Sequence, residues 1–328
     1  MLDIHHIIAD GISTGILIKE LMALYQGVPL PELRLQYKDF SEWQNSEQQR
    51  KVIEKQGEYW LEVFQGEIPK LDLPIDYERP MNRSFAGASR GFQIPGQESR
   101  ALRNLAAEQE ATLFMIVLAL FNILLAKTSG QEDIVIGTPV AGRSHPDVEH
   151  VIGMFLNTLA LRNYPEAQKT FREFFREIKT RTLQAFENQA YQFEDLVDRV
   201  ISTRDPGRNP LFDVMLMFQG QGEMPQEIPT VEIPGLKLKP YPQENKTSKF
   251  DLTLWAFELE PAGTLSFAFE YCTKLFKQET IEILIDSFKA IISAVLADPD
   301  TPISEIEITS AAEQTGELSQ LTDDLTRE

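Results

Sequence analysis

The sequence predicts an α/β sandwich, in which helices and strands mix without a strict alternation of strand and helix. Two kinds of periodicity support this prediction. Apolar residues recur at helical spacing over 171–186, and alternating or continuous apolar runs typical of strands occupy 133–140 and 267–271. No nucleotide-binding sheet is expected, because the glycines at Gly220 and Gly222 lack the following glycine or lysine of a phosphate loop.

The first part of the chain is expected to contain a strand and two helices. Residues 1–10 read as a strand that leads into a His-His pair. Ser13 offers an oxygen to cap an amphipathic helix that runs to about residue 26. The apolar face of this helix comprises Ile16, Leu17, Leu21 and Leu24. A second helix passes through 59–64, and the proline-containing segment 68–90 places a lobe boundary near residue 88.

The remaining sequence predicts a second lobe that is richer in strands. Helices are expected at 98–109, 112–127, 171–186 and 278–297. Strands are expected at 91–94, 133–140, 154–162, 212–218, 230–240, 250–258 and 264–271. Cys272 follows an alternating run, which indicates strand core rather than a nucleophile. We therefore divide the chain into a first lobe at 1–88, a second lobe at 89–308 and a polar tail at 309–328.

Composition favours an ordinary globular protein. The 328 residues are 42% hydrophobic and 25% charged, which is enough for two lobes with their own cores. The net charge of −19 argues against a nucleic-acid or membrane partner, because phosphates would repel it. A single cysteine excludes an intramolecular disulfide and a cysteine-rich zinc site. The apolar segment 113–125 is too short to span a membrane, and no signal peptide is recognisable, so we expect a cytoplasmic protein.

The most informative stretch begins with His5 and His6, which are followed by Asp10 and Gly11. A neutral imidazole where a buried strand ends can accept a proton near pH 7, which is the requirement for a general base. Taken alone, such a pair is more often a packed strand end. The rest of the sequence favours a functional role for the pair.

Five stretches, in the same order, resemble the motifs of condensation domains of nonribosomal peptide synthetases. The pattern His-His-x-x-x-Asp-Gly at 5–11 resembles the core motif of that family. The other four are Tyr37 to Trp43, Ile152 to Leu159 with Arg162, Asn188 to Glu194, and Arg204 to Leu211. The resemblance runs from Met1 to about Ile308, which is nearly the whole chain.

The resemblance implies a chloramphenicol-acetyltransferase-like fold, a sandwich of two lobes around a tunnel. A complete condensation domain places a large part of its first lobe before the His-His motif. The resemblance therefore implies that the first lobe is incomplete in this chain, with 1–88 as its remnant. The tail at 309–328 resembles a linker toward an adenylation domain.

The resemblance also assigns roles within the His motif. His6 is implied as the catalytic residue, either as the base that takes the amine proton or as a group that orients the amine, and His5 is then structural. Asp10 reads either as a carboxylate that orients a base or as the partner in an ion pair that fixes the loop. The family favours the ion pair, and Arg143 is the candidate partner. Gly11 is a candidate to present a backbone N–H to the developing oxyanion.

Two further interpretations concern residues outside the His motif. Asn157 either reaches the tunnel as a hydrogen-bonding group or is a strand-end residue satisfied by backbone. His145 and His150 add nitrogen donors to those of the His motif, which raises the question of a metal site. The spacing matches no metal-binding motif, so we expect no metal.

The function implied by the resemblance is peptide-bond formation. An upstream acyl or peptidyl thioester would be joined to the amine of a downstream aminoacyl thioester. Both would arrive on the 4′-phosphopantetheine arms of upstream and downstream peptidyl carrier domains, with an adenylation domain adjacent and no cofactor bound directly. Two alternatives are a CoA-dependent acyltransferase of the same fold and an inert fragment that only docks carrier domains.

Overall fold

The structure, a computed structural model, describes residues 3–143, 145–220, 246–259 and 263–308. At its centre lies a six-stranded sheet with the strand order β1-β6-β5-β4-β2-β3. The strands are β1 (Gly87–Gln93), β2 (Ile134–Val140), β3 (Asn157–Asn163), β4 (Val214–Gln219), β5 (Leu252–Leu259) and β6 (Thr264–Cys272). The pairs β2–β4 and β4–β5 are parallel and the other pairs are antiparallel. This open, mixed sheet with flanking helices confirms the predicted α/β class.

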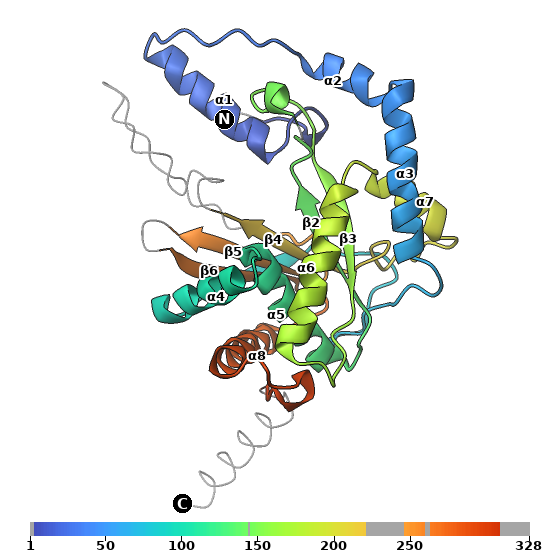
Figure 1. Ribbon diagram of the computed structural model, residues 1–328, viewed down its shortest axis with the longest axis vertical. Coiled ribbons are helices and arrows are strands. Elements are labelled where there is room, and N and C mark those ends of the chain that lie inside the picture. The colour runs from blue at the N-terminus through green and yellow to red at the C-terminus, as the bar shows by residue number, and fades with distance from the viewer. Residues whose placement is uncertain (1–2, 144, 221–245, 260–262, 309–328) are drawn as a thin grey trace, which may run out of the picture.

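The helices lie mostly on one side of this sheet. They are α1 (Gly11–Tyr25), α2 (Tyr37–Gln44), α3 (Glu47–Val63), α4 (Gly96–Glu108), α5 (Leu113–Ser129), α6 (Phe171–Glu187), α7 (Phe193–Val200) and α8 (Gln278–Ala297). Short 3-10 turns occur at η1 (His6–Ile8), η2 (Pro146–Val148) and η3 (Ile303–Glu305). Figure 1 shows α4, α5 and α8 beneath β4, β5 and β6, whereas α1 and α2 lie apart from the sheet.

The core is built around α5. Every residue from Met115 to Ala126 is buried, which confirms the predicted helix that is buried nearly all round. Thr112 caps the start of α5 by accepting a hydrogen bond from the Met115 amide, and Gly130 ends it in the left-handed conformation at φ 70°. In the described residues no single helix is long and apolar enough to cross a membrane. Only α4 and α5 taken together meet that length and composition, and they are bent by 106°.

Alternation along β5 and β6 directs one set of side chains toward α8. Phe267 and Phe269 on β6 meet Phe288 of α8 edge to face, with ring centroids 5.4 and 6.3 Å apart. Leu254 and the other inward residues of β5 are also fully buried. Cys272 is 3% exposed at the end of β6, which confirms the prediction of strand core.

The first three helices differ in how firmly they are attached. Trp60 of α3 is 2% exposed, and its indole N–H donates to the carbonyl of Asn188 at 2.9 Å. By contrast, Leu21 and Leu24 of α1 are 64% and 56% exposed. Ile16 and Leu17 are half-buried, so only the first half of the predicted apolar face is packed against the described part of the chain.

Several predicted elements need correction. Residues 3–10 form no strand; they contain the turn η1 instead, and Ser13 does not cap α1. The helix α7 was not predicted, because eight residues provide little periodicity. The strand expected at 154–162 begins only at Asn157. The strand expected at 230–240 and the tail at 309–328 lie outside the described residues.

Candidate active site

The His motif forms a tight turn rather than the end of a strand. His5 precedes η1, and its Nδ1 accepts a hydrogen bond from the Ile7 amide at 3.1 Å. This side-chain bond to a nearby backbone amide stabilises the turn against an extended conformation. His5 is thus engaged as a structural acceptor, and its neighbour His6 is carried on the turn itself.

Among the described residues, the ring of His6 is held through one of its nitrogens. Its Nδ1 lies 2.8 Å from the carbonyl oxygen of Ala9. A carbonyl can only accept, so Nδ1 must carry the proton in this contact and Nε2 of the neutral ring keeps its lone pair. The residue is exposed, so that Nε2 is available to a substrate. This is the tautomer that a proton acceptor at Nε2 requires.

Asp10 is the cap of α1 and is almost completely buried, with 1% exposure. Its Oδ1 accepts from the Ser13 amide at 2.7 Å, and its Oδ2 accepts from the Phe155 amide at 3.2 Å. A carboxylate at this position satisfies one of the free N–H groups of the first turn and suits the positive end of the helix dipole. Asp10 therefore takes the capping role that the sequence suggested for Ser13.

Arg143 is the ion-pair partner that was predicted for Asp10. Its Nη2 lies 3.1 Å from Oδ1 and 3.2 Å from Oδ2 of the carboxylate. Its Nη1 donates to the carbonyls of Val148 and Val151, both at 2.7 Å. The side chains of the pair are 5% and 0% exposed, so the two charges lie together out of water. The Nε of this guanidinium has no hydrogen-bond partner among the described residues.

Ser13 completes the connection, and the sequence analysis missed this role. Its hydroxyl donates to the Gly153 carbonyl at 2.9 Å and accepts from the Gly153 amide at 3.0 Å and from Arg143 Nη2 at 3.0 Å. The Asp10 amide also donates to the Gly153 carbonyl at 3.3 Å. One buried hydroxyl thus joins the first turn of α1 to a loop 140 residues further along the chain.

The environment of Asp10 determines its ionisation. Burial alone would raise the pKa of this carboxyl, but hydrogen bonds from Ser13 and Phe155, together with the charge of Arg143, outweigh it. The pKa of Asp10 is therefore held below its ordinary value of 3.8. The residue is ionised at neutral pH and is fully engaged by the loop. In the part of the chain that the structure describes, no hydrogen bond joins Asp10 to the His6 ring, so the geometry corresponds to the ion-pair interpretation.

Aromatic side chains of α2 pack against the loop that contains Gly153 and Phe155. The rings of Tyr37 and Phe40 in α2 contact the ring of Phe155 at 5.1 and 4.7 Å, and the Tyr37 hydroxyl donates to the Met154 carbonyl at 2.7 Å. A Cβ at Gly153 would collide with the Tyr37 ring. A Cβ at Gly142 would collide with the Phe155 carbonyl, and Gly142 also has φ 64°. Both loop glycines are required by close approach.

Asn157 is engaged entirely by backbone. Its Nδ2 donates to the carbonyls of Gln189 and Tyr191 at 2.8 and 2.7 Å. Its Oδ1 accepts from the amides of Thr158 and Phe193 at 2.8 and 3.2 Å. All the hydrogen-bonding capacity of the amide is in use. The side chain holds the turn between α6 and α7, which is the second of the two alternatives for this residue.

The remaining candidates are Gly11 and the histidines outside the motif. Gly11 is the first residue of α1, where backbone N–H groups have no intrahelical acceptor. His145 is a surface residue whose Nδ1 accepts from the Asp147 amide at 3.2 Å. Within the described part of the chain, no three histidine, cysteine or acidic side chains converge as a metal site.

Comparison with known proteins identifies a family that this chain matches. The family model named Condensation domain matches residues 1–316. Gramicidin S synthase 2 of Brevibacillus brevis is 49% identical over 314 residues, which are 95% of this chain and 7% of that protein. Bacitracin synthase 3 of Bacillus licheniformis is 45% identical over 323 residues, 98% of this chain and 5% of that protein. The chain thus spans less than a tenth of the length of these relatives.

Solved structures are similar in fold. The crystal structure of holo-AB3403, a four-domain nonribosomal peptide synthetase bound to AMP and glycine, aligns with a TM-score of 0.81 at 25% identity, over 95% of this chain and 24% of that one. The X-domain from teicoplanin biosynthesis aligns with a TM-score of 0.82 at 22% identity, over 93% of this chain and 71% of that one. Together with the family match and the arrangement of the His motif, these similarities show that the chain belongs to the condensation-domain family.

Proposed function

We propose that this chain forms a peptide bond between two carrier-bound substrates, with His6 as the residue that acts on the reacting amine. The observation that carries this proposal is the contact between His6 Nδ1 and the Ala9 carbonyl, which leaves Nε2 free to accept a proton. Family membership supports the reaction class, and the geometry of the turn supports the choice of His6.

The reaction needs one proton transfer. The amine nitrogen of the acceptor attacks the thioester carbon of the donor, so that a C–N bond forms and the C–S bond breaks. The proton that the amine loses passes to His6 Nε2 and from there to the departing thiolate. Holding both thioesters beside the ring makes their encounter effectively unimolecular, which lowers the barrier independently of the base.

The negative charge that develops on the thioester oxygen needs donors. We assign the first N–H groups of α1 to this role, with Gly11 as the first of them, because a helix N-terminus presents unsatisfied N–H groups and a positive dipole end. Asp10 and Arg143 act as positioning residues, since they fix the turn that carries His6 and make no contact with its ring.

The partners follow from the proposed reaction. The substrates would be delivered on the 4′-phosphopantetheine arms of an upstream and a downstream carrier domain, and an adenylation domain would lie next in the chain. No cofactor bound by the chain itself enters this scheme. We keep the division into lobes at 1–88 and 89–308, because the described sheet lies in the second lobe apart from the first two residues of β1.

The test uses the purified chain with a loaded donor carrier and a loaded acceptor carrier, and it detects carrier-bound dipeptide by mass spectrometry. We expect product from the native sequence, loss of product in His6→Ala, and retention in His5→Asn, whose amide oxygen can replace the Nδ1 acceptor of His5. Product that survives His6→Ala would contradict the proposal. Turnover of free CoA thioesters without carriers would favour the CoA-dependent acyltransferase. Carrier binding without product would favour the docking fragment.

A further inference from the structure

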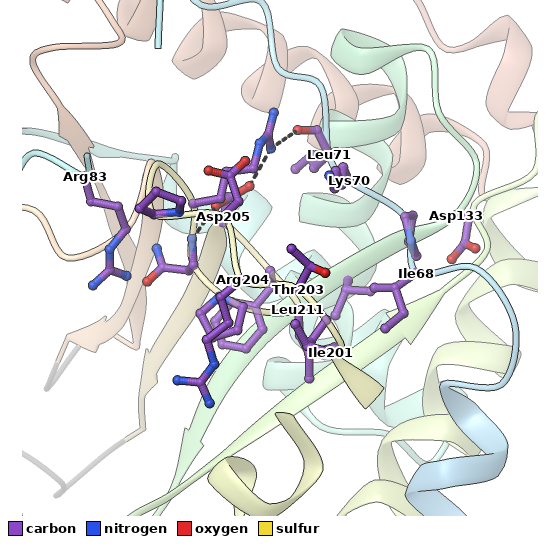
Figure 2. A pocket seen from close by; sticks show the side chains of 18 residues that line it. Ile68, Lys70, Leu71, Arg83, Asp133, Ile201, Thr203, Arg204, Asp205 and Leu211 are labelled. Atoms are coloured by element: carbon purple, nitrogen blue, oxygen red, sulfur yellow. Dashed lines mark hydrogen bonds and ion pairs between the residues drawn. The ribbon is translucent and has the colours of Figure 1, made fainter. Parts of the chain in front are cut away.

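A cavity that takes no part in the proposed reaction lies where β2 begins, beside the loop that leads into β4. Its volume is about 290 Å³, and it is lined by residues 68–71, the start of β2 and the loop 201–213 between α7 and β4, together with Arg83. Figure 2 shows side chains from all three segments pointing into the same space. None of the residues of the His motif lines this cavity.

The two ends of the cavity differ in chemistry. Ile68 and Ile201 lie at one end, with the buried side chains of Val135 and Leu211 forming more of the wall. Arg83 and Arg204 lie on the other side of this space from Ile68, as Figure 2 shows. An apolar chamber with cations at one mouth is complementary to a molecule that has an apolar body and one anionic head.

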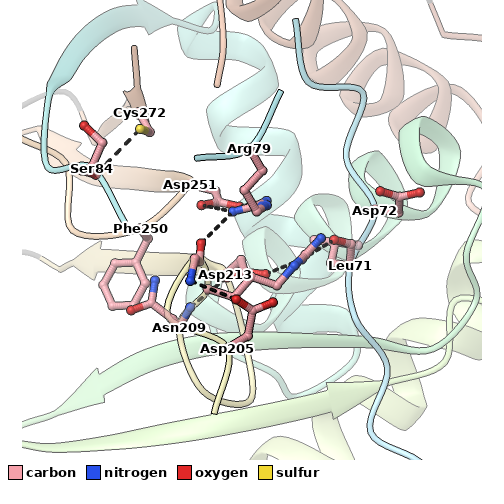
Figure 3. Close-up of polar contacts among 12 residues, drawn as sticks. Leu71, Asp72, Arg79, Ser84, Asp205, Asn209, Asp213, Phe250, Asp251 and Cys272 are labelled. Atoms are coloured by element: carbon pink, nitrogen blue, oxygen red, sulfur yellow. Dashed lines mark hydrogen bonds and ion pairs between the residues drawn. The ribbon is translucent and has the colours of Figure 1, made fainter. Parts of the chain in front are cut away.

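The floor of the cavity is held by hydrogen bonds and is internally neutralised by an ion pair. Arg208 Nη1 lies 2.6 Å from Asp213 Oδ2 and donates to the Leu71 carbonyl at 3.0 Å, and the Asn209 amide donates to Asp213 Oδ1 at 3.0 Å. Figure 3 shows this network beside the ion pair of Arg79 with Asp251. Asp133, a second acidic residue of the wall, pairs with Arg162 at 2.7 Å.

The positive charges of Lys70, Arg83 and Arg204, which form the rim of the cavity, are little compensated by nearby carboxylates. Within the described part of the chain, Lys70 and Arg83 take part in no ion pair, and Arg204 pairs with Asp198 only where both side chains are about 70% exposed. An exposed pair of this kind contributes little free energy, so an incoming anion can compete for Arg204. Asp205 is the opposing charge, and one of its oxygens already accepts from the Gly207 amide at 2.8 Å. A positive rim is notable in a chain with a net charge of −19.

Leu211 in the wall has a backbone conformation that side chains rarely adopt. Its φ is 67°, in the left-handed region, and the residue is 6% exposed. Such strain is maintained only where the surroundings enforce it, and it is concentrated at functional loops. Here it directs an apolar side chain into the cavity wall between Pro210 and Phe212, which also line the cavity.

From this arrangement we infer that the cavity is a binding site for a small apolar carboxylate, separate from the condensation site. At about 30 Å³ per water-sized group, the volume admits about ten non-hydrogen atoms. An eight-carbon carboxylate has this size. Its chain would lie along Ile68, Ile201 and Leu211, and its head would lie between Arg83 and Arg204.

The test is calorimetric titration of the chain with octanoate, beside octanamide and octylamine, which share the apolar body but lack the negative charge. We expect octanoate to bind up to about fivefold more tightly than octanamide, because an exposed charge pair contributes at most about 1 kcal/mol. The preference should shrink as salt is raised, because the rim is exposed to solvent.

Variants at the rim locate the site without disturbing the core. Arg83→Gln and Arg204→Gln should each remove most of the preference for octanoate, and Thr203→Trp should block the cavity from its exposed edge. Arg100→Gln is the matched control, since it removes the same charge from the exposed face of α4. Equal binding of octanoate and octanamide, an equal loss in Arg100→Gln, or no binding of octanoate would each overturn the inference.

Discussion

The ion pair of Asp10 and Arg143 offers the sharpest perturbation of the site. We expect Asp10→Asn and Arg143→Gln each to lower the free energy of unfolding by about 3 kcal/mol, because each leaves one buried charge without its partner. The side chains are 0% and 5% exposed, so solvent screening does not reduce this cost. The double variant removes both charges and should cost little more than either single variant.

The magnitude to be measured is therefore a coupling energy. We expect about 2 kcal/mol between the two substitutions, within the range found for residues that share one hydrogen-bond network. Urea unfolding of the four proteins gives this value. Hydrogen exchange of the Ser13 and Phe155 amides reports the same loss locally, because both amides donate to the Asp10 carboxylate.

The chain provides a matched control. Arg204 and Asp198 approach to 2.6 Å, closer than the Asp10–Arg143 pair, but their side chains are 67% and 70% exposed. Their coupling energy should stay below about 1 kcal/mol, as for other surface pairs. Additive effects of Asp10→Asn and Arg143→Gln, or a coupling no larger than that of the exposed pair, would refute the reasoning that burial makes this ion pair organise the turn.

The remaining predictions concern the pH response, the loop glycines and Asn157. The pKa of Asp10 is lower in the folded chain than its ordinary value of 3.8, so its stabilising contribution is present above about pH 4 and is lost as the pH falls further; acid unfolding should be less steep in Asp10→Asn. Gly142→Ala should destabilise by at least about 1 kcal/mol in thermal unfolding, whereas Gly27→Ala, with a similar φ but open space around it, should cost less. Asn157→Ala should cost about 1–3 kcal/mol in urea unfolding, because it removes a buried donor and acceptor, whereas Asn45→Ala at the exposed end of α2 should cost under 1 kcal/mol.

The fold was largely predictable wherever periodicity was long. Helices near 112–127 and 278–297 appear at α5 and α8, because a continuous or repeating apolar pattern over four or more turns leaves few alternatives. The start of the chain was mispredicted for the opposite reason. Side-chain bonds from His5 and Asp10 to nearby amides decide the turn at η1 and the start of α1, and apolar patterning does not report such bonds.

The site was predictable only in part. The partnership of Asp10 with Arg143 was proposed from the sequence, whereas the contacts of Ser13 with Gly153 were not, because nothing in a sequence signals a hydroxyl that bonds to backbone 140 residues away. Asn157 lies in a motif of the family, yet its role depends on Gln189, Tyr191 and Phe193, which only the folded chain brings to it. The cavity beside Arg83 and Arg204 likewise depends on tertiary structure.

The central claim is that His6 presents an unprotonated Nε2, and nitrogen NMR of the ring tests it most directly. The chain has four histidines, so a sample labelled at histidine and compared with His6→Gln identifies the signals of this ring. The contact with the Ala9 carbonyl predicts that neutral His6 carries its proton on Nδ1. A neutral ring protonated on Nε2 would contradict the account, because that nitrogen could then no longer accept the proton of the amine.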